Sequence, residues 1–363
     1  MRKDLFLVLG SVTMLGCMPV PVPSGNVNDT DTDTQSNIDT EFEPEPDPEP
    51  ESTTESETET ETETETETET ETETETETET NPTDCDNLPS LPVDYDIMYG
   101  FSTAEDFTFD ELGNMVAVKS GNLARMDYDG DVVDIISPGF GEMAGTSILA
   151  DGDIVIANPN NGRVLRVTSE GGQTNILTGV SYPNGVTVGP EGYVYVSGHN
   201  DGEIFKVDPD TSEYEIIANG IGGANGMAFS PDGQTLYVCS FWTSRIYRIP
   251  RDGNGGWENK ELIGTYGWGG LDGLNVDECG YLYVTEYIQG KVWRIDPTKN
   301  NPDGEIVAEL PSSWIPNLHW GRGPSNPQFD GFQGNVLYVA DRDQGRVFAL
   351  QVGVESTPQV YDQ

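Results

Sequence analysis

Residues 184–196 read Asn184-Gly-Val-Thr-Val-Gly-Pro-Glu-Gly-Tyr-Val-Tyr-Val. Two strand-like segments rich in Val and Tyr flank a Gly-Pro-Glu-Gly turn, and this order is typical of an antiparallel hairpin. The same order returns at Asn225-Gly-Met-Ala-Phe before Gly233 and at Asp272-Gly-Leu-Asn-Val before Gly280. A unit that repeats at a nearly fixed period indicates a solenoid or a propeller, so this hairpin decides the fold.

A further strand-like segment with a basic or aromatic centre appears six times along the chain. The six copies are Gly121-Asn-Leu-Ala-Arg, Gly162-Arg-Val-Leu-Arg, Gly202-Glu-Ile-Phe-Lys, Ser244-Arg-Ile-Tyr-Arg, Gly290-Lys-Val-Trp-Arg and Gly345-Arg-Val-Phe-Ala. They are about 40 residues apart at first and about 55 at the end, which suits four strands per copy. We therefore predict an all-β fold, a six-bladed β-propeller of four-stranded antiparallel blades, with seven blades as the alternative. Residues 93–101 are expected to supply the outer strand of the last blade and so close the ring.

The first 84 residues differ in composition from the rest of the chain. Two basic residues precede an apolar run from Leu5 to Leu15, as in an export signal. The sequence Met14-Leu-Gly-Cys17 resembles a bacterial lipobox, which implies cleavage before Cys17 and a lipid on its sulfur. We expect a lipoprotein signal peptide at residues 1–16 and an exported protein, lipid-anchored to the cell envelope at the outer membrane or the cell surface. An ordinary secretory peptide is the alternative.

Residues 17–84 contain 24 acidic side chains and no Lys or Arg. The unbroken Glu-Thr alternation within them has no apolar face to bury, so we expect a disordered, acidic, Pro- and Glu-Thr-rich tether. Residues 85–363, the predicted propeller domain, carry 39 acidic and 15 basic side chains. Both parts are acidic, which argues against nucleic acid and anionic lipid surfaces as partners. We expect a monomer that meets the membrane only through its lipid.

Four polar side chains stand at one offset in four of the repeats, eight residues before the glycine of the hairpin turn. The pairs are Glu105 with Gly113, Asn184 with Gly192, Asn225 with Gly233 and Asp272 with Gly280. Equivalent positions in a cyclic repeat face one place on the axis, so we expect four oxygen donors to converge there. Carboxylate and amide oxygens without paired His or thiol ligands suit Ca²⁺, or Mg²⁺ or Mn²⁺, better than zinc. The alternative is that Asn-Gly and Asp-Gly are simply turn dipeptides.

The loops between the second and third strands of the blades should open on the same face as these four residues. The loop residues expected around this mouth are Lys119, Asn158 to Asn161, His199, Asn200, Phe241, Trp242, Glu286, Tyr287 and Asp341. Of these, Glu286 is expected to be a solvated loop charge. His319, at the start of an irregular sixth blade, is expected either to line the mouth or to pack on Trp320.

From about Ser102 to Val352 the chain resembles the family of senescence marker protein, gluconolactonase and luciferin-regenerating enzyme. The motifs that carry the resemblance are Glu105, Pro183-Asn184-Gly185, Ala224-Asn225-Gly226 with Ser230-Pro-Asp-Gly233, and Leu271-Asp272-Gly273 before Tyr281-Leu-Tyr-Val284. The resemblance implies a six-bladed propeller that binds a divalent cation, calcium above all. The ligands that it implies are Glu105, Asn184, Asn225 and Asp272.

The resemblance also implies hydrolysis of a lactone or a related ester. In this reaction the cation polarises the carbonyl group and Asp272 activates water, with His199 as the second candidate for the base. Tyr182 stands where sugar-lactone hydrolases of the family often carry an arginine, and Gly185 stands in place of an acid. We therefore expect a small-molecule lactone or ester of more apolar character, at an aromatic mouth that includes Trp268. The alternative is a non-catalytic propeller, similar to the NHL type, that binds a ligand or a protein and holds a structural cation.

With Cys17 lipidated, three cysteines remain in an oxidising compartment. Cys279 lies in a hairpin turn on the face away from the cation, and Cys85 lies just before the closing strand. A Cys85–Cys279 disulfide is therefore the preferred pairing, and Cys239 is then a buried free thiol. A Cys239–Cys279 pair is the alternative, because sequence alone leaves the connectivity open.

Overall fold

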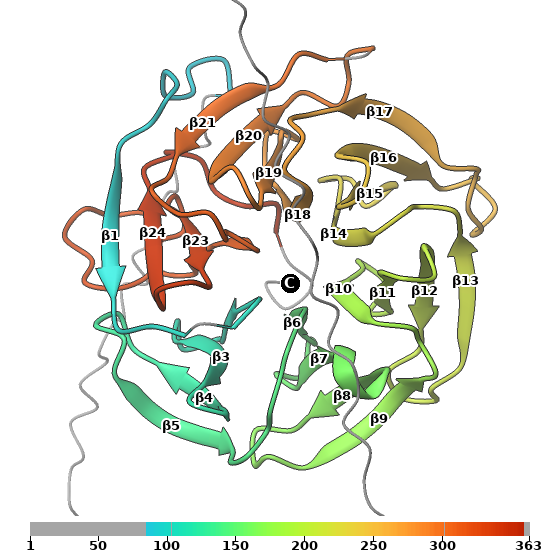
Figure 1. Cartoon of the computed structure of the whole chain (residues 1–363), viewed down its shortest axis with the longest axis horizontal. Helices are drawn as coiled ribbons and strands as arrows, with labels where there is room; N and C mark the ends of the chain where they lie inside the picture. Colours follow the sequence, from blue (N-terminus) through green and yellow to red (C-terminus); the bar gives the residue numbers. More distant parts are fainter. Residues whose placement is uncertain (1–84, 103, 301, 359–363) are drawn as a thin grey trace, which may run out of the picture. The chain divides into compact units, whose positions relative to one another are not determined.

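Six four-stranded antiparallel sheets stand around a central axis as the blades of a propeller (Figure 1). The computed structural model describes residues 85–102, 104–300 and 302–358. The predicted all-β, six-bladed fold is confirmed. The predictions for residues 1–16, for Cys17 and for the tether up to residue 84 lie outside the described residues. Within the described part of the chain, no helix is both long and apolar enough to cross a bilayer.

In every blade the first strand lies nearest the axis and the fourth lies at the rim (Figure 1). Blade one consists of β2 (Thr108–Phe109), β3 (Met115–Lys119), β4 (Asn122–Met126) and β5 (Val132–Ser137). Blade two consists of β6 (Thr146–Ile148), β7 (Ile154–Asn158), β8 (Arg163–Val167) and β9 (Gln173–Thr178), with the short 3-10 helix η1 (Pro159–Asn161) after β7. Blade three consists of β10 (Pro183–Val188), β11 (Val194–Gly198), β12 (Glu203–Val207) and β13 (Tyr214–Ala218).

The other three blades follow the same order, except that the last takes its outer strand from the start of the domain. Blade four consists of β14 (Ala224–Phe229), β15 (Thr235–Ser240), β16 (Arg245–Pro250) and β17 (Glu261–Thr265). Blade five consists of β18 (Leu271–Val276), β19 (Leu282–Glu286), β20 (Lys291–Ile295) and β21 (Glu305–Glu309). Blade six consists of β22 (Leu318–Trp320), β23 (Leu337–Asp341), β24 (Arg346–Leu350) and β1 (Tyr95–Tyr99).

The strand β1 closes the ring, as predicted for residues 93–101. It pairs antiparallel with β24, from Tyr95 opposite Leu350 to Tyr99 opposite Arg346. Figure 1 shows this contact as a cyan strand beside a red one. Closure by strands from both ends of the domain means that the ring cannot open without breaking a sheet.

Buried tyrosines on the second strands pack one blade against the next. Tyr195 meets Phe229 with ring centroids 5.0 Å apart, and Tyr283 meets Trp320 at 5.1 Å. Phe229 and Trp320 end the innermost strands of blades four and six. Edge-to-face contacts of this kind add about 0.5–1.5 kcal/mol beyond the burial of area. The repeated Tyr of the hairpin motif therefore sets the contact between neighbouring blades.

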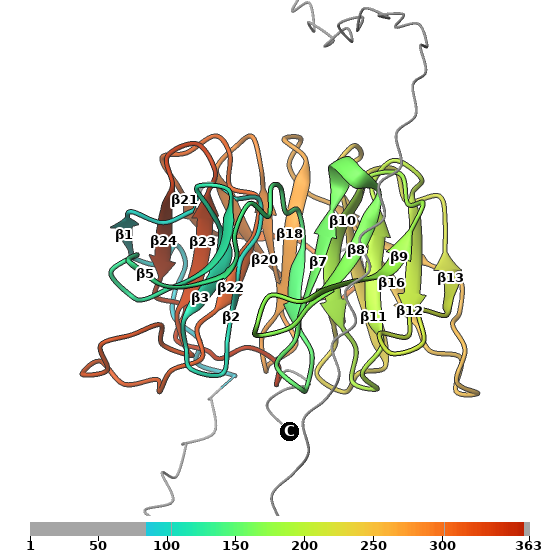
Figure 2. The ribbon, with the colours of Figure 1, turned by 90° about the horizontal axis from the view of Figure 1, so that it is seen from below.

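The two faces of the propeller carry different loops. The loops between second and third strands open on one face, which we call the upper face, and the turns between first and second strands lie on the opposite, lower face. Figure 2 shows the strands running between these two faces. Each innermost strand starts near the upper face, because Pro183 at the start of β10 pairs with Gly198 at the end of β11.

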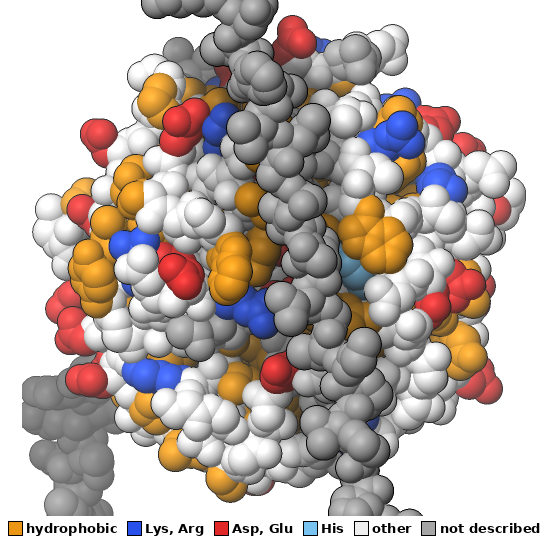
Figure 3. All heavy atoms as spheres, in the orientation of Figure 1, with side chains coloured by type: hydrophobic (Ala, Val, Ile, Leu, Met, Phe, Trp, Pro, Cys, Tyr) orange, Lys and Arg blue, Asp and Glu red, His pale blue; other side chains and the backbone are white. Residues whose placement is uncertain are grey.

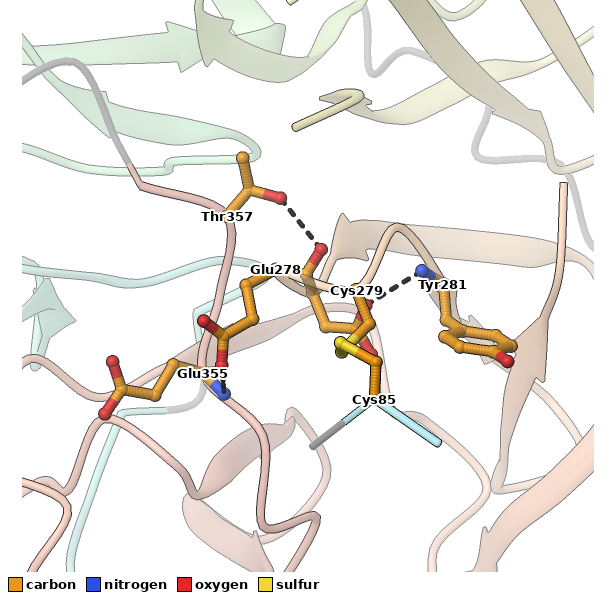
Figure 4. Close-up of a disulfide and its surroundings, with 7 residues drawn as sticks. Cys85, Glu278, Cys279, Tyr281, Glu355 and Thr357 are labelled. Carbon is orange, nitrogen blue, oxygen red and sulfur yellow. Dashed lines mark hydrogen bonds between the residues drawn. A yellow bond between two sulfur atoms is a disulfide. The ribbon is translucent and has the colours of Figure 1, made fainter. Parts of the chain in front are cut away.

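The disulfide lies on the lower face and joins Cys85 to Cys279, with the two sulfur atoms 1.98 Å apart. This is the pairing that the sequence favours, and Cys239 is a buried free thiol. Near the disulfide, the Thr357 hydroxyl donates to the Asp277 carbonyl at 3.0 Å (Figure 4). The N-terminal segment and the C-terminal segment therefore meet at the same turn of blade five.

Asp277 lies in this turn and is fully buried. Burial raises the pKa of Asp277 from 3.8 to about 6, although its carboxylate accepts a hydrogen bond from the Tyr281 N–H. The folded chain keeps the proton to a higher pH than the unfolded chain does. The contribution of Asp277 to stability therefore falls as the pH rises between these two values, and it stays low above them.

Replacing Asp277 with Asn is expected to raise the free energy of unfolding at pH 7 by about 1–3 kcal/mol, and to change it little at pH 4. The neutral amide keeps an acceptor oxygen for Tyr281 and removes the cost of burying a charge. Urea unfolding of both proteins between pH 4 and pH 8 measures the difference. A difference that does not grow with pH would contradict this account.

Candidate metal centre

The four residues at the common offset lie where the innermost strands begin, near the upper face. Asn184 lies in β10, Asn225 in β14 and Asp272 in β18, and Glu105 lies just before β2. The register of blades three, four and five shifts at this place, so two residues of the inner strand oppose one residue of its neighbour. Such a β-bulge changes the direction of side chains relative to regular alternation. One repeated irregularity thus places three of the donors alike.

The glycines that follow Asn184 and Asn225 are required by the neighbouring blade, whereas Glu105 is followed by Asp106. A Cβ on Gly185 would lie 2.4 Å from the carbonyl oxygen of Asn225, and one on Gly226 would lie 2.5 Å from that of Asp272. These are backbone atoms, so no side chain fits at either position. The Asn-Gly and Asp-Gly dipeptides are therefore strand residues at a blade contact, and their interpretation as turns is wrong. The same contact explains why Gly185 cannot be an acid.

The structure brings the four donors into one group. The side-chain amide of Asn184 donates to Oε1 of Glu105 at 3.4 Å. Asn225 makes a side-chain hydrogen bond with Asp272. The carboxylates of Asp272 and Glu105 lie close enough to repel each other. Asn184, Asn225 and Asp272 are each only 4% exposed.

Burial and mutual repulsion disfavour the ionised carboxylates. Burial raises the pKa of Glu105 above its usual value, against the opposing effects of Arg342 and Asn184. Burial and the charge of Glu105 raise the pKa of Asp272 well above its usual value, against the hydrogen bond from Asn225. A pair of buried like charges needs a positive partner to be stable in ionised form.

A hard divalent cation fits this donor set. Among the described residues, no three His, Cys, Asp or Glu side chains form a metal-binding group. The site therefore depends on the amide oxygens of Asn184 and Asn225 as well as on the two carboxylates. Such an all-oxygen set of two anions and two neutral donors matches the preference of Ca²⁺.

Blades two and six contribute no donor of this kind. Ala144 stands in the equivalent position of blade two, as the sequence indicates, and strand register aligns Pro316 with Asp272 in blade six. The Pro316 carbonyl accepts a hydrogen bond from the Thr285 hydroxyl at 3.1 Å. The four donors therefore come from the consecutive blades three, four and five, and from blade one.

Arg342 is a member of the site that sequence reasoning missed. Its Nη1 donates to Oε2 of Glu105 at 2.7 Å. Its guanidinium also hydrogen-bonds to the Tyr287 side chain, and its side chain is 39% exposed. Arg342 follows Asp341 in the upper loop of blade six, so a census of every charge in these loops would have found it.

His199 lies beside the site among aromatic rings. Its ring centroid is 5.6 Å from Tyr182, 5.8 Å from Phe241 and 5.2 Å from Trp242. Burial lowers the pKa of His199, so the neutral imidazole is favoured. Its role as a base remains a prediction.

Two acids expected around the mouth are buried and serve the structure. Glu286 is 1% exposed and accepts hydrogen bonds from the N–H groups of Trp268 and Gly269, at 2.8 and 2.9 Å. The prediction that Glu286 is a solvated loop charge is wrong, because these donors hold the preceding loop against blade five. Asp341 is fully buried and paired with Arg346.

The channel continues below the candidate metal centre. A cavity of about 640 Å³ opens toward the lower face and is lined by residues that include Asp106, Thr108, Ser147, Thr187, Asn275 and His319. His319 Nε2 lies 2.9 Å from Oδ1 of Asp106, which is only 2% exposed. His319 therefore lines the channel below the site, and not the upper mouth.

Exposed aromatic side chains surround the upper mouth. Trp242 is 58% exposed, Trp268 is 74% exposed and Trp314 is 48% exposed. Trp314 stacks on Tyr287 with an angle of 7° between the rings. Figure 3 shows hydrophobic side chains on both sides of the centre of this face, beside basic ones. The aromatic mouth expected from the sequence is thus present in blades four to six.

The family described as SMP-30/Gluconolactonase/LRE-like region matches residues 178–326. The resemblance predicted from the sequence is confirmed over this range, which includes Asn184, Asn225 and Asp272. The curated relatives that match include proteins named as lactonases. The 6-deoxy-6-sulfogluconolactonase of Pseudomonas putida is 28% identical over 152 residues, 40% of this chain and 47% of that protein. Pentonolactonase XacC of Haloferax volcanii is 28% identical over 265 residues, 67% of this chain and 88% of that protein.

Solved structures share the fold at lower sequence identity. A gluconolactonase from Xanthomonas campestris aligns with a TM-score of 0.59 at 18% identity, over 74% of this chain and 94% of that one. A calcium-binding protein, regucalcin, from Agrobacterium tumefaciens aligns with a TM-score of 0.54 at 20% identity, over 72% of this chain and 96% of that one. The match to the sulfogluconolactonase spans only about half of that relative.

Proposed function

We propose that this propeller hydrolyses a small-molecule lactone or ester with the help of a divalent cation held by Glu105, Asn184, Asn225 and Asp272. The observation that carries the proposal is the grouping of these four oxygen donors where the innermost strands begin, on the face that carries the exposed Trp242, Trp268 and Trp314. The lactonase names of the curated relatives support the reaction type. The calcium-binding protein of the same fold supports the cation.

The bound cation and Asp272 would have different roles in this reaction. The bound cation would supply a Lewis acid to the carbonyl group and charge stabilisation to the oxyanion. Asp272 is the proposed base, because a carboxylate at the edge of the cation site can take a proton from a water molecule positioned for attack. The water oxygen bonds to the acyl carbon, the acyl–oxygen bond of the ring breaks, and the proton taken by Asp272 passes to the leaving oxygen. The products are a carboxylic acid and an alcohol in one molecule.

The proposed cellular setting rests on the sequence of residues 1–84. We propose that the protein is exported and anchored to the cell envelope by a lipid on Cys17, and that an acidic tether separates the propeller from the envelope. Labelling with a lipid precursor, compared between the natural chain and Cys17→Ser, tests the anchor. A chain that takes up no lipid would be a plain secreted protein.

Chelation is expected to lower the turnover of a responsive lactone by at least about 100-fold, and added Ca²⁺ is expected to restore it. The cation should also raise stability, by about 2.7 kcal/mol at 100 times its dissociation constant. A pH-indicator assay with a panel of neutral and charged lactones measures the first effect, and thermal unfolding measures the second.

Two variants identify the site in this experiment. Glu105→Gln should weaken the stabilisation by Ca²⁺, whereas Glu305→Gln should leave it intact. Glu305 is a matched control, since it pairs with Arg294 on the outer part of blade five. Stabilisation by Ca²⁺ without turnover of any lactone would favour the non-catalytic binding module instead.

A further inference from the structure

We propose that Arg342 is the specificity-determining residue of the substrate site, and that it selects lactones which carry an anionic group. The proposal rests on the proposed function and names its substrate class. The group recognised would be a carboxylate, sulfonate or phosphate, because a planar guanidinium binds such oxygens with two parallel hydrogen bonds.

The position of Arg342 meets the first requirement for such a role. The upper loop of blade six delivers it to the metal centre from the wall opposite β10, and its Nη1 contacts Glu105. The main-chain N–H of Arg342 donates to the Trp314 carbonyl at 3.0 Å, which fixes the base of the side chain. The side chain remains 39% exposed to the mouth. A guanidinium has five N–H donors, and its contacts with Glu105 and Tyr287 leave others for a ligand.

The charge balance of the site meets the second requirement. Glu105 and Asp272 together carry two negative charges when ionised, and a divalent cation neutralises both. This leaves the positive charge of Arg342 available for a ligand. Two other acids act on Glu105: Asp106 lies beside His319, and Glu142 is exposed. Because the exposed acids of the domain are screened within about 8 Å by physiological salt, the local charge decides what the site attracts.

Arg342 also changes the expectation drawn from Tyr182. The sequence predicts a more apolar substrate, since no arginine stands at position 182. In the folded chain Arg342 lies within electrostatic reach of Tyr182. A positive charge is thus supplied to this part of the mouth from another blade. The aromatic rim with Trp314 and Tyr287 then covers the uncharged part of the substrate.

The role of Arg342 contrasts with that of other arginines of the propeller. Arg166 contacts three aspartates and Arg294 contacts Glu305, and both arginines lie on third strands, away from the innermost ones. Glu105, by contrast, is the acid that a cation would share with Arg342.

The test compares ligands that differ by one anionic group. Calorimetry with Ca²⁺-loaded protein measures the binding of 1,5-anhydroglucitol and of its 6-phosphate, neither of which contains a lactone. Turnover is measured in parallel with glucono-1,5-lactone and its 6-phosphate. The natural chain is expected to prefer the phosphorylated member of each pair. Arg342→Gln should lower binding and kcat/KM for that member by about 10- to 100-fold, and those for the neutral member by less than about threefold. Arg342→Lys should lie between.

The control is Arg248→Gln. Arg248 forms an exposed ion pair with Glu261 on blade four, with a side chain that is 37% exposed, close to the value for Arg342. This variant should keep the natural preference. If Arg342→Gln weakened the binding of both ligands equally, the proposal would be overturned, since Arg342 would then only support Glu105. Equal binding of both ligands by the natural chain would overturn it as well.

The outcomes separate this proposal from the proposed function. Selective binding of the phosphorylated ring that depends on Arg342, without turnover of any lactone, would refute the hydrolase and support the anion site. Cation-dependent turnover with no dependence on the anionic group would support the hydrolase and refute the anion site.

Discussion

Replacing Asp272 with Asn is expected to lower kcat/KM for lactone hydrolysis by about 100- to 10,000-fold, the range that a positioned general base supplies. Asn has nearly the same shape and keeps one side-chain oxygen for the cation, while its NH2 group takes the place of the other carboxylate oxygen. It cannot accept a proton from water. Circular dichroism should therefore show an intact fold, while the indicator assay shows the loss.

Two further variants serve as comparisons for Asp272→Asn. His199→Gln should cost less than about tenfold, because a neutral ring packed on Trp242 orients the site without taking the proton. Asp277→Asn should retain full activity per folded molecule, since Asp277 lies just beyond β18 at the opposite face. If His199→Gln removed activity and Asp272→Asn kept it, the imidazole would be the base.

The sequence predicts those parts of the protein that repeat. The hairpin motif recurs with its glycine and tyrosine, so the blade number and the closing strand follow from it. Asn184, Asn225 and Asp272 are predictable for the same reason, because the bulge that positions them recurs in blades three to five. Glu105 is predictable from its equal offset to the turn glycine. The glycine after Asn184, Asn225 and Asp272 also carries structural information. Its close contact with the neighbouring blade distinguishes a strand position from a turn.

The parts that the sequence does not predict depend on contacts between unlike blades. Arg342 comes from the irregular sixth blade, where an insertion breaks the register. Asp106 replaces the glycine of the repeat and meets His319 across the closure of the ring. Glu286 is buried only because the loop at Trp268 folds over it. No periodic signal marks such residues, since each makes a contact that occurs once.

Replacing both Cys85 and Cys279 with Ser is expected to lower the free energy of unfolding by about 3–5 kcal/mol. The disulfide closes a loop with a sequence separation of 194 residues, so it restricts much of the unfolded chain. It also holds the segment before β1 on blade five, next to the Thr357 contact (Figure 4). Since β1 closes the ring, loss of this attachment should favour opening of blade six.

Guanidinium unfolding of the double variant and of the natural chain measures this loss, and the natural chain under reducing conditions should match the variant. Hydrogen exchange can locate the effect, because amides of β1 and β24 should exchange faster in the variant while those of blade three should not. The strand pairing from Tyr95 to Tyr99 and the Val93 N–H bond to the Val307 carbonyl would remain. If these contacts alone closed the ring, the free energies of unfolding of the double variant and the natural chain would differ by less than about 1 kcal/mol. The protection of the β1 amides against hydrogen exchange would then be unchanged. That outcome would mean that the pairing of β1 with β24 closes the ring, and that the disulfide only fixes the segment at Cys85.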